Sequence, residues 1–339
     1  MNTTNRRPRV VADRNIPLLD TLIGQSVDLI NLAPDDITPE VMSTADAIIT
    51  RTRTRCDAAL LDGSPCRLVA TATIGTDHID FDYCHRRGIR VVSAPGCNAP
   101  AVAQYVWSSI LRLTAGKRPE DVTVGIVGVG HVGSIVERWG RSMGYRVLLC
   151  DPPRADREGA DAFVSLDRIA RESDVITFHT PLTADGPYPT RHIADAAFLG
   201  SLARRPVIIN SARGPVVDNR ALVDALDRGL VSHAVIDCWE GEPAISPELL
   251  ERATYATPHI AGYSADGKTR ASIVVAHAVA DTFGVACNDT IATPPPAPET
   301  MTAGRVLASY DPVADTERLK ADPATFEQQR NHYHLRPEA

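Results

Sequence analysis

The sequence predicts an α/β protein with two parallel-sheet domains, one inserted into the other, and a short C-terminal extension. Short apolar runs alternate with helical patterns along most of the 339 residues, which is typical of βαβ units. A glycine-rich turn, G-V-G-H-V-G at 128–133, joins a strand pattern to a helical pattern near the middle of the chain. The proline run at 294–298 predicts where the alternation ends and the extension begins.

The composition indicates a globular protein and excludes several functions. Hydrophobic residues make up 44% of the chain and charged residues 23%. The net charge of −7 argues against general nucleic-acid binding. No run approaches about 18 apolar residues, so we expect neither a membrane span nor a signal peptide. The seven cysteines are scattered without a C-x-x-C pair, which favours a reduced, cytoplasmic protein with no metal site.

We expect residues 1–95 and 263–289 to form the first domain, which binds the substrate. A helical pattern at 266–283 returns the chain to this domain after the insertion. The first turn of the domain is poor in glycine, which argues against a dinucleotide site there. The predicted strands of its sheet are Arg9–Ala12, Val27–Ile30, Ala47–Thr50, Leu68–Thr71 and Arg90–Ser93.

Two loops of this first domain carry polar residues just after predicted strands. One loop begins with Arg51 and Thr52, and the other contains Thr73. Loops at the carboxyl ends of parallel strands are where small polar ligands bind. Ordinary turn chemistry is the alternative explanation for both threonines.

The inserted domain, residues 96–262, contains the glycine-rich turn. Gly128 permits a tight turn, Gly130 lets a pyrophosphate approach the backbone, and Gly133 lets the following helix pack on the strand. The next strand ends at Asp151, about 20 residues on, as a Rossmann-type dinucleotide site requires. Asp151 can accept hydrogen bonds from a ribose and would repel a 2′-phosphate, which favours NAD. Arg154 leaves NADP as the alternative. The predicted strands are Val122–Val127, Val147–Cys150, Val175–His179, Val207–Asn210, Val231–Ile236 and Tyr255–Thr257.

Residues 290–339 form a stiff linker and a polar tail too small to build its own core. Three alternatives are open for this tail. It packs on the body of the protein, pairs with another subunit, or is partly disordered.

Three ionisable residues follow predicted strands in the second half of the inserted domain. They are Arg213, Glu242 and His259, and the carboxyl ends of parallel strands bring such residues to one crevice. These residue types fit hydride transfer at a 2-hydroxy acid. Arg213 can hold a carboxylate, His259 can exchange the C2 hydroxyl proton, and Glu242 can orient the imidazole. Each residue taken singly has an ordinary alternative: a surface ion pair for Arg213, a loop charge for Glu242 and a turn histidine for His259.

Four motifs give the chain a resemblance to a known family. G-V-G-H-V-G, N-S-A-R-G-P-V-V-D, D-C-W-E-G-E-P and T-P-H-I-A-G-Y resemble motifs of the D-isomer-specific 2-hydroxyacid dehydrogenases. The resemblance implies two domains, flavodoxin-like and Rossmann-like, with Arg213, Glu242 and His259 as catalytic residues. The expected NAD contacts are Gly128, Gly130, His131, Val132, Gly133, Asp151, Thr180, Asp237 and Gly262. The expected substrate contacts are Arg51, Thr52, Thr73 and Tyr263.

A narrower resemblance concerns the substrate. The runs A-T-I-G-T-D-H, S-A-P-G-C-N-A and L-L-C-D-P-P-R-A-D resemble family members that oxidise 4-phosphoerythronate. This implies a homodimer that acts on a small phosphate-bearing 2-hydroxy acid. Those members carry a longer C-terminal dimerisation domain, so the dimer geometry is left open. The alternatives are a reductase that converts phosphonopyruvate to phosphonolactate, and a non-catalytic NAD-binding interaction protein.

Overall fold

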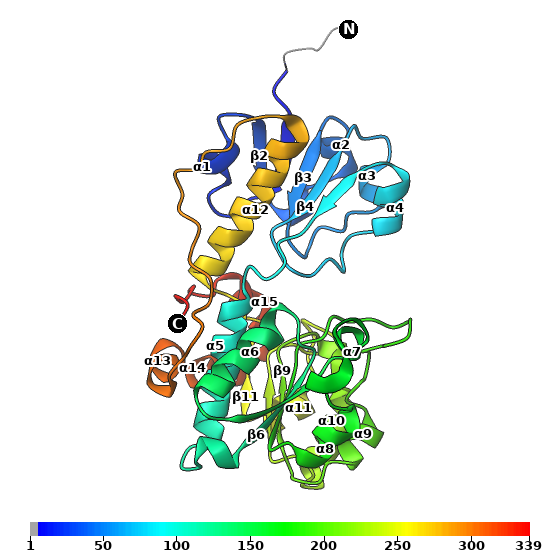
Figure 1. The fold of residues 1–339 in the computed structure, drawn as a ribbon. Helices are drawn as coiled ribbons and strands as arrows, with labels where there is room; N and C mark the ends of the chain where they lie inside the picture. Colours follow the sequence, from blue (N-terminus) through cyan, green and yellow to red (C-terminus); the bar gives the residue numbers. More distant parts are fainter. Residues whose placement is uncertain (1–5) are drawn as a thin grey trace. The chain divides into compact units, whose positions relative to one another are not determined.

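The computed structural model describes residues 6–339, and the chain divides into two compact α/β units (Figure 1). Unit 1 contains the chain up to Asn98 and again Ala265–Pro295. Unit 2 contains Ala99–Ser264 and Pro296–Ala339. The predicted fold class, with two parallel-sheet domains, is confirmed.

Unit 1 is a five-stranded parallel sheet in the order β2-β1-β3-β4-β5. Helices α1 and α12 cover one face, where Leu19 and Val279 are buried, and α2 to α4 cover the other, where Met42 and Leu61 are buried. The strands are β1 (Arg9–Asp13), β2 (Asp28–Leu32), β3 (Ala47–Thr50), β4 (Leu68–Thr71) and β5 (Arg90–Val92). The helices are α1 (Leu19–Ile23), α2 (Pro39–Met42), α3 (Ala58–Leu61), α4 (Phe81–Arg86) and α12 (Ala265–Phe283).

Unit 2 is a six-stranded parallel sheet in the order β11-β10-β9-β8-β6-β7. Helices α5 and α6 pack on one face around Trp107 and Trp139, and α8 to α11 pack on the other around Phe178. The strands are β6 (Thr123–Val127), β7 (Arg146–Cys150), β8 (Val175–Phe178), β9 (Val207–Asn210), β10 (His233–Ile236) and β11 (Tyr255–Ala256). The helices are α5 (Ala99–Leu113), α6 (His131–Ser142), α7 (Pro152–Glu158), α8 (Leu166–Glu172), α9 (Ala196–Gly200), α10 (Asn219–Asp227) and α11 (Pro247–Arg252).

The strand order explains where unit 2 can bind a ligand. Strand β6 has β7 on one side and β8 on the other, so the direction of the chain across the sheet reverses at β6. Ligands of such sheets bind outside the carboxyl ends of the strands, next to this reversal. The glycine-rich turn follows β6 directly, and Arg213, Glu242 and His259 follow β9, β10 and β11.

The C-terminal segment, Pro296–Ala339, packs on unit 2 of its own chain, as the first of the three alternatives for the tail describes. It forms α13 (Ala303–Ser309), α14 (Val313–Ala321) and α15 (Phe326–Asn331). The Trp139 indole donates to the Pro298 carbonyl over 2.9 Å, and the Ser108 hydroxyl donates to the Tyr310 carbonyl over 2.7 Å. Phe326 is fully buried in the core of unit 2.

Two global features concern membranes and disulfides. Over residues 6–339, none of the helices combines the length and the apolar character that crossing a membrane requires. The seven cysteines are free thiols, and six of them are buried.

Candidate active site

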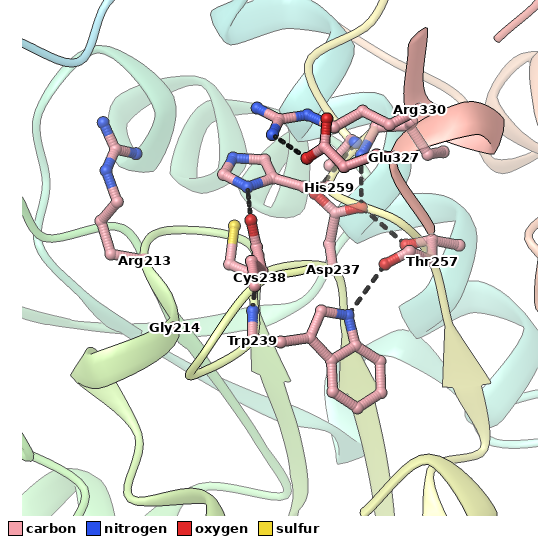
Figure 2. A network of polar contacts seen from close by, with 12 residues as sticks. Arg213, Gly214, Asp237, Cys238, Trp239, Thr257, His259, Glu327 and Arg330 are labelled. Carbon is pink, nitrogen blue, oxygen red and sulfur yellow. Dashed lines mark hydrogen bonds and ion pairs between the residues drawn. The ribbon is translucent and has the colours of Figure 1, made fainter. Parts of the chain in front are cut away.

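His259 and Glu242 form a hydrogen-bonded pair in unit 2 (Figure 2). His259 Nδ1 lies 2.8 Å from Glu242 Oε2, and the backbone N–H of Trp239 donates to Glu242 Oε1 over 2.8 Å. A carboxylate only accepts hydrogen bonds, so Nδ1 carries the proton that it shares with Glu242. The second ring nitrogen, Nε2, is then the atom for proton exchange with a substrate.

Asp237, directly after β10, shapes the loop that carries His259. Its buried carboxylate accepts from the backbone N–H groups of Ile260 and Ala261 and from the Thr257 hydroxyl, at 2.7, 3.0 and 2.6 Å. The His259 N–H donates to the Asp237 carbonyl, and His259 has a φ of 56°. A histidine in this left-handed region is uncommon, so the loop is held by its hydrogen bonds rather than by local preference.

Arg213 is held beside the site because the loops after β9 and β10 are joined to each other. Asn210, fully buried at the end of β9, donates from Nδ2 to the carbonyls of Arg213, Gly214 and Cys238. Gly214 lies against the backbone of Trp239, and a Cβ at 214 would be 1.9 Å from the Trp239 carbonyl oxygen. The loops after β9 and β10 therefore fit together only with glycine at 214.

The environment of Glu242 favours its ionised form. Burial opposes ionisation, but the His259 charge and hydrogen bond, the Trp239 N–H and the Arg330 guanidinium outweigh it. Together they hold the pKa of Glu242 below its ordinary value. An ionised Glu242 can orient the His259 ring and stabilise a positive charge on it.

The glycine-rich turn has the shape that a dinucleotide needs. Gly128 has a φ of 87°, and a Cβ there would lie 2.8 Å from the backbone of His179 and Thr180. A Cβ at Gly133 would lie 2.1 Å from the Gly128 carbonyl oxygen, whereas one at Gly130 would meet open space. Gly130 is the N-cap residue of α6, and the first N–H groups of this helix can receive a pyrophosphate.

Polar groups along the same sheet edge also fit a bound nucleotide. The buried hydroxyls of Thr180 and Ser211 have no hydrogen-bond partner among the residues that the structure describes. Buried polar groups of this kind are normally satisfied, so a ligand is their natural partner. Sequence reasoning missed Ser211, although its motif N-S-A-R was identified.

Asp151 and Arg154 are positioned differently from one another. Asp151 accepts from the Val129 N–H of the glycine turn over 2.8 Å and from the Arg154 N–H over 2.9 Å. The Arg154 guanidinium instead pairs with Glu158 and donates to the Val129 carbonyl. Asp151 thus lies at the glycine-rich turn. Arg154, the residue that left NADP as an alternative cofactor, has Glu158 as a carboxylate partner.

Comparison with known proteins agrees with this geometry. Residues 100–261 match the model of the D-isomer specific 2-hydroxyacid dehydrogenase, NAD binding domain. The chain is 45% identical to a Bacteroides thetaiotaomicron protein and 41% identical to a Porphyromonas gingivalis protein, both named erythronate-4-phosphate dehydrogenase. The first match covers 97% of both chains, and the second covers 96% of this chain and 92% of the relative.

The chain belongs to the D-isomer-specific 2-hydroxyacid dehydrogenase family. It is an NAD-dependent oxidoreductase. A solved D-lactate dehydrogenase from Aquifex aeolicus, complexed with NAD and lactic acid, is 25% identical and superposes with a TM-score of 0.67 over 81% of this chain and 96% of that one. Because the Bacteroides match covers 97% of both chains, it includes the C-terminal segment in which we expected a departure from the relatives.

The remaining expected contacts of the dehydrogenase divide between the two units. Arg51, Thr52 and Thr73 belong to unit 1, where Thr73 bonds Thr71 over 2.7 Å and donates to the Gly75 carbonyl over 3.0 Å. Tyr263 belongs to unit 2, together with Arg213, Glu242 and His259. His131 and Val132, in the first turn of α6, and Gly262 also belong to unit 2.

Within residues 6–339, two groups of side chains have the spacing of metal ligands. Cys238, Glu242 and His259 form one, and His277, Cys287 and Asp289 form the other. Burial and neighbouring carboxylates raise the pKa of the Cys238 thiol well above its ordinary value, which disfavours the thiolate that a metal needs. In the second group, burial and Asp289 raise the pKa of Cys287 as well.

Proposed function

We propose that this dehydrogenase oxidises 4-phosphoerythronate at C2 to the 2-oxo acid. The hydrogen bond between His259 and Glu242, on the unit that carries the glycine-rich turn, is the observation that carries the proposal. An acid–base pair beside the cofactor is what oxidation of an alcohol requires. The names of the relatives that match nearly the whole chain support the choice of substrate.

The proposed reaction assigns one task to each residue. Arg213 holds the C1 carboxylate and thereby fixes C2 beside His259. His259 Nε2 accepts the proton of the C2 hydroxyl, and Glu242 stabilises the imidazolium that results. NAD, when bound, supplies the acceptor for the hydride that leaves C2. In the reverse direction, His259 returns the proton to the ketone oxygen.

The second anion of the substrate needs a site of its own. We assign it to Arg51, Thr52 and Thr73 of unit 1, because hydroxyls and a guanidinium suit the three acceptor oxygens of a phosphate. A substrate that leaves these polar groups without hydrogen-bond partners loses binding free energy. The site should therefore reject 2-hydroxy acids that lack a phosphate or phosphonate.

A substrate panel tests this function. The purified protein is assayed with NAD and 4-phosphoerythronate, D-glycerate or D-lactate, and with NADH and phosphonopyruvate. We expect kcat/KM for 4-phosphoerythronate to exceed that for the unphosphorylated acids by more than about 10²-fold. Equal turnover of D-lactate would contradict the second-anion site. Preference for phosphonopyruvate would instead establish the reductase alternative.

We propose a cytoplasmic location for the dehydrogenase. Its seven cysteines are all free thiols, which suits a reducing compartment. Fractionation of the source cells, followed by immunoblotting, tests this. Recovery with an oxidising extracellular or periplasmic fraction would contradict it.

We further propose that the dehydrogenase is a homodimer. Leu307 and Val313, on the C-terminal segment, are two large apolar side chains that are more than a third exposed, and a partner surface would cover them. Light scattering coupled to size-exclusion chromatography should give twice the chain mass of 36.5 kDa. A single species at the chain mass would contradict the dimer.

A further inference from the structure

Arg330, on α15 of the C-terminal segment, is a buried cation beside the acid–base pair. Its side chain is only 14% exposed. Its Nε donates to the Tyr263 hydroxyl over 3.2 Å, and its Nη1 lies 3.6 Å from Glu327 Oε1. A guanidinium is expensive to bury unless it is paired, so its position calls for an explanation.

The charge of Arg330 acts on the residues that carry out the chemistry. Figure 2 shows Arg330 and Glu327 on one side of His259 and Arg213 on the other. The Arg330 guanidinium helps to lower the pKa of Glu242, and Glu242 in turn helps to raise the pKa of Arg330. The two charges therefore interact across the site.

The rest of the C-terminal segment fixes Arg330 in this place. Arg336, almost fully buried, donates to the carbonyls of Ile260 and Ala261, the two residues after His259. It also donates to the Ala101 carbonyl and to Gln104 Oε1 on α5. The end of the chain is thus clamped to the loop that carries the acid–base histidine.

Other charged groups near Glu242 do not replace Arg330. His259 bonds Glu242 directly but changes its charge during the reaction, whereas an arginine stays protonated. The Cys238 thiol is held neutral by burial, and the Asp237 carboxylate is occupied by backbone N–H groups. Arg213 extends on the far side of His259 in Figure 2.

We propose that Arg330 is a positioning residue for the reaction, which holds the Tyr263 hydroxyl and supplies a permanent cation opposite Glu242. When His259 is neutral, Arg330, which also pairs with Glu327 at 3.6 Å, still supplies positive charge near the Glu242 carboxylate. When His259 is protonated, Glu242 is already charged and in place to stabilise it. The C-terminal segment is then part of the active site of its own chain, and the proposal rests on the proposed role of the Glu242–His259 pair.

Substitutions at 330 and a matched control test this role. Arg330→Gln removes the charge, Arg330→Lys keeps it, and Arg318→Gln removes an exposed arginine from α14 of the same segment. Oxidation kinetics are measured against pH for each, with the 2-hydroxy acid that turns over best. The choice of that acid keeps the test independent of whether 4-phosphoerythronate is the substrate.

We expect Arg330→Gln to lower kcat by about 10-fold to 100-fold, the usual effect of losing a charged hydrogen-bond partner. Removal of the cation favours protonation of both members of the pair, so the acid limb of the kcat profile should move to higher pH. Arg330→Lys should keep that limb near its wild-type position with a smaller loss of kcat. Arg318→Gln should match wild type, and the NAD dissociation constant should be unchanged in all three.

Two outcomes would overturn the proposal. An increase in KM alone, with kcat and the pH profile of wild type, would make Arg330 a substrate contact instead. Equal pH profiles for the Gln and Lys variants would show that its charge does not act on the pair. If Arg330→Gln fails to fold, Arg330→Lys and Tyr263→Phe provide the test. Both substitutions should lower kcat while the acid limb of the pH profile stays in place. A wild-type kcat in both variants would contradict the positioning role.

Discussion

The backbone of Gly214 lies directly against the carbonyl group of Trp239. This contact joins the loop that carries Arg213 to the loop that carries Glu242. Asn210 reinforces it by donating to carbonyls on both loops. The distance between Arg213 and the Glu242–His259 pair is thus set by a glycine and a buried amide.

Gly214→Ala should disrupt this arrangement. The new Cβ would lie 1.9 Å from the Trp239 carbonyl oxygen, so the two loops must separate. We expect a loss of about 1–3 kcal/mol of stability, as for other overpacked sites, and a marked fall in kcat. Thermal unfolding and steady-state kinetics measure both. Gly200→Ala is the control, because a Cβ there meets open space, and equal behaviour of the two variants would refute the packing argument.

Asp151→Ser should narrow the preference for NAD over NADP. The substitution removes the carboxylate that faces the glycine turn and would repel a 2′-phosphate. The ratio of kcat/KM for the two cofactors measures the effect, with Asp161→Ser as an exposed control. Asp151 also caps α7, a role that serine can keep, so we expect little loss of stability, and thermal unfolding is measured separately. If the ratio of kcat/KM for NAD to that for NADP equals the wild-type ratio, Asp151 does not contact the ribose.

Glu242 should make the free energy of unfolding depend on pH in the acidic range. Its folded-state pKa lies below the ordinary value of 4.5, so its ionised form stabilises the fold above about that pH. The stabilisation is lost as the pH falls through the lower, folded-state pKa. The free energy of unfolding of Glu242→Gln should therefore lie below that of wild type near neutral pH, and the gap should shrink on acidification. Glu251→Gln, at an exposed position, is the control, and a gap independent of pH would contradict the ionised assignment.

Much of the fold could be predicted because the strands are buried on both faces. Such strands appear as continuous apolar runs, and the predicted limits of Ala47–Thr50, Leu68–Thr71 and Val207–Asn210 agree with the structure. The glycine spacing at 128–133 predicted the turn after β6 because such a turn leaves little room for side chains. Gly128 and Gly133 there answer steric demands that no other residue meets.

The C-terminal segment could not be placed in the same way. Its buried apolar side chains, such as Tyr310 and Phe326, are few and lie in or beside three short helices, so they give only a modest helical pattern. Arg330 and Arg336 resemble surface charges in the sequence, because only the fold reveals the partners that allow an arginine to be buried. Asn210 and Ser211 were missed likewise, since a polar residue at a strand end has many ordinary roles.

The most direct test of the account is the kinetics of His259→Asn. Loss of the general base should lower kcat for oxidation by about 10²–10⁴-fold, while the NAD dissociation constant and the thermal stability stay near those of wild type. His332→Asn, at an exposed position of the C-terminal segment, should have wild-type kinetics. Turnover of His259→Asn within a few-fold of wild type would contradict the assignment of His259 and Glu242 as the acid–base pair.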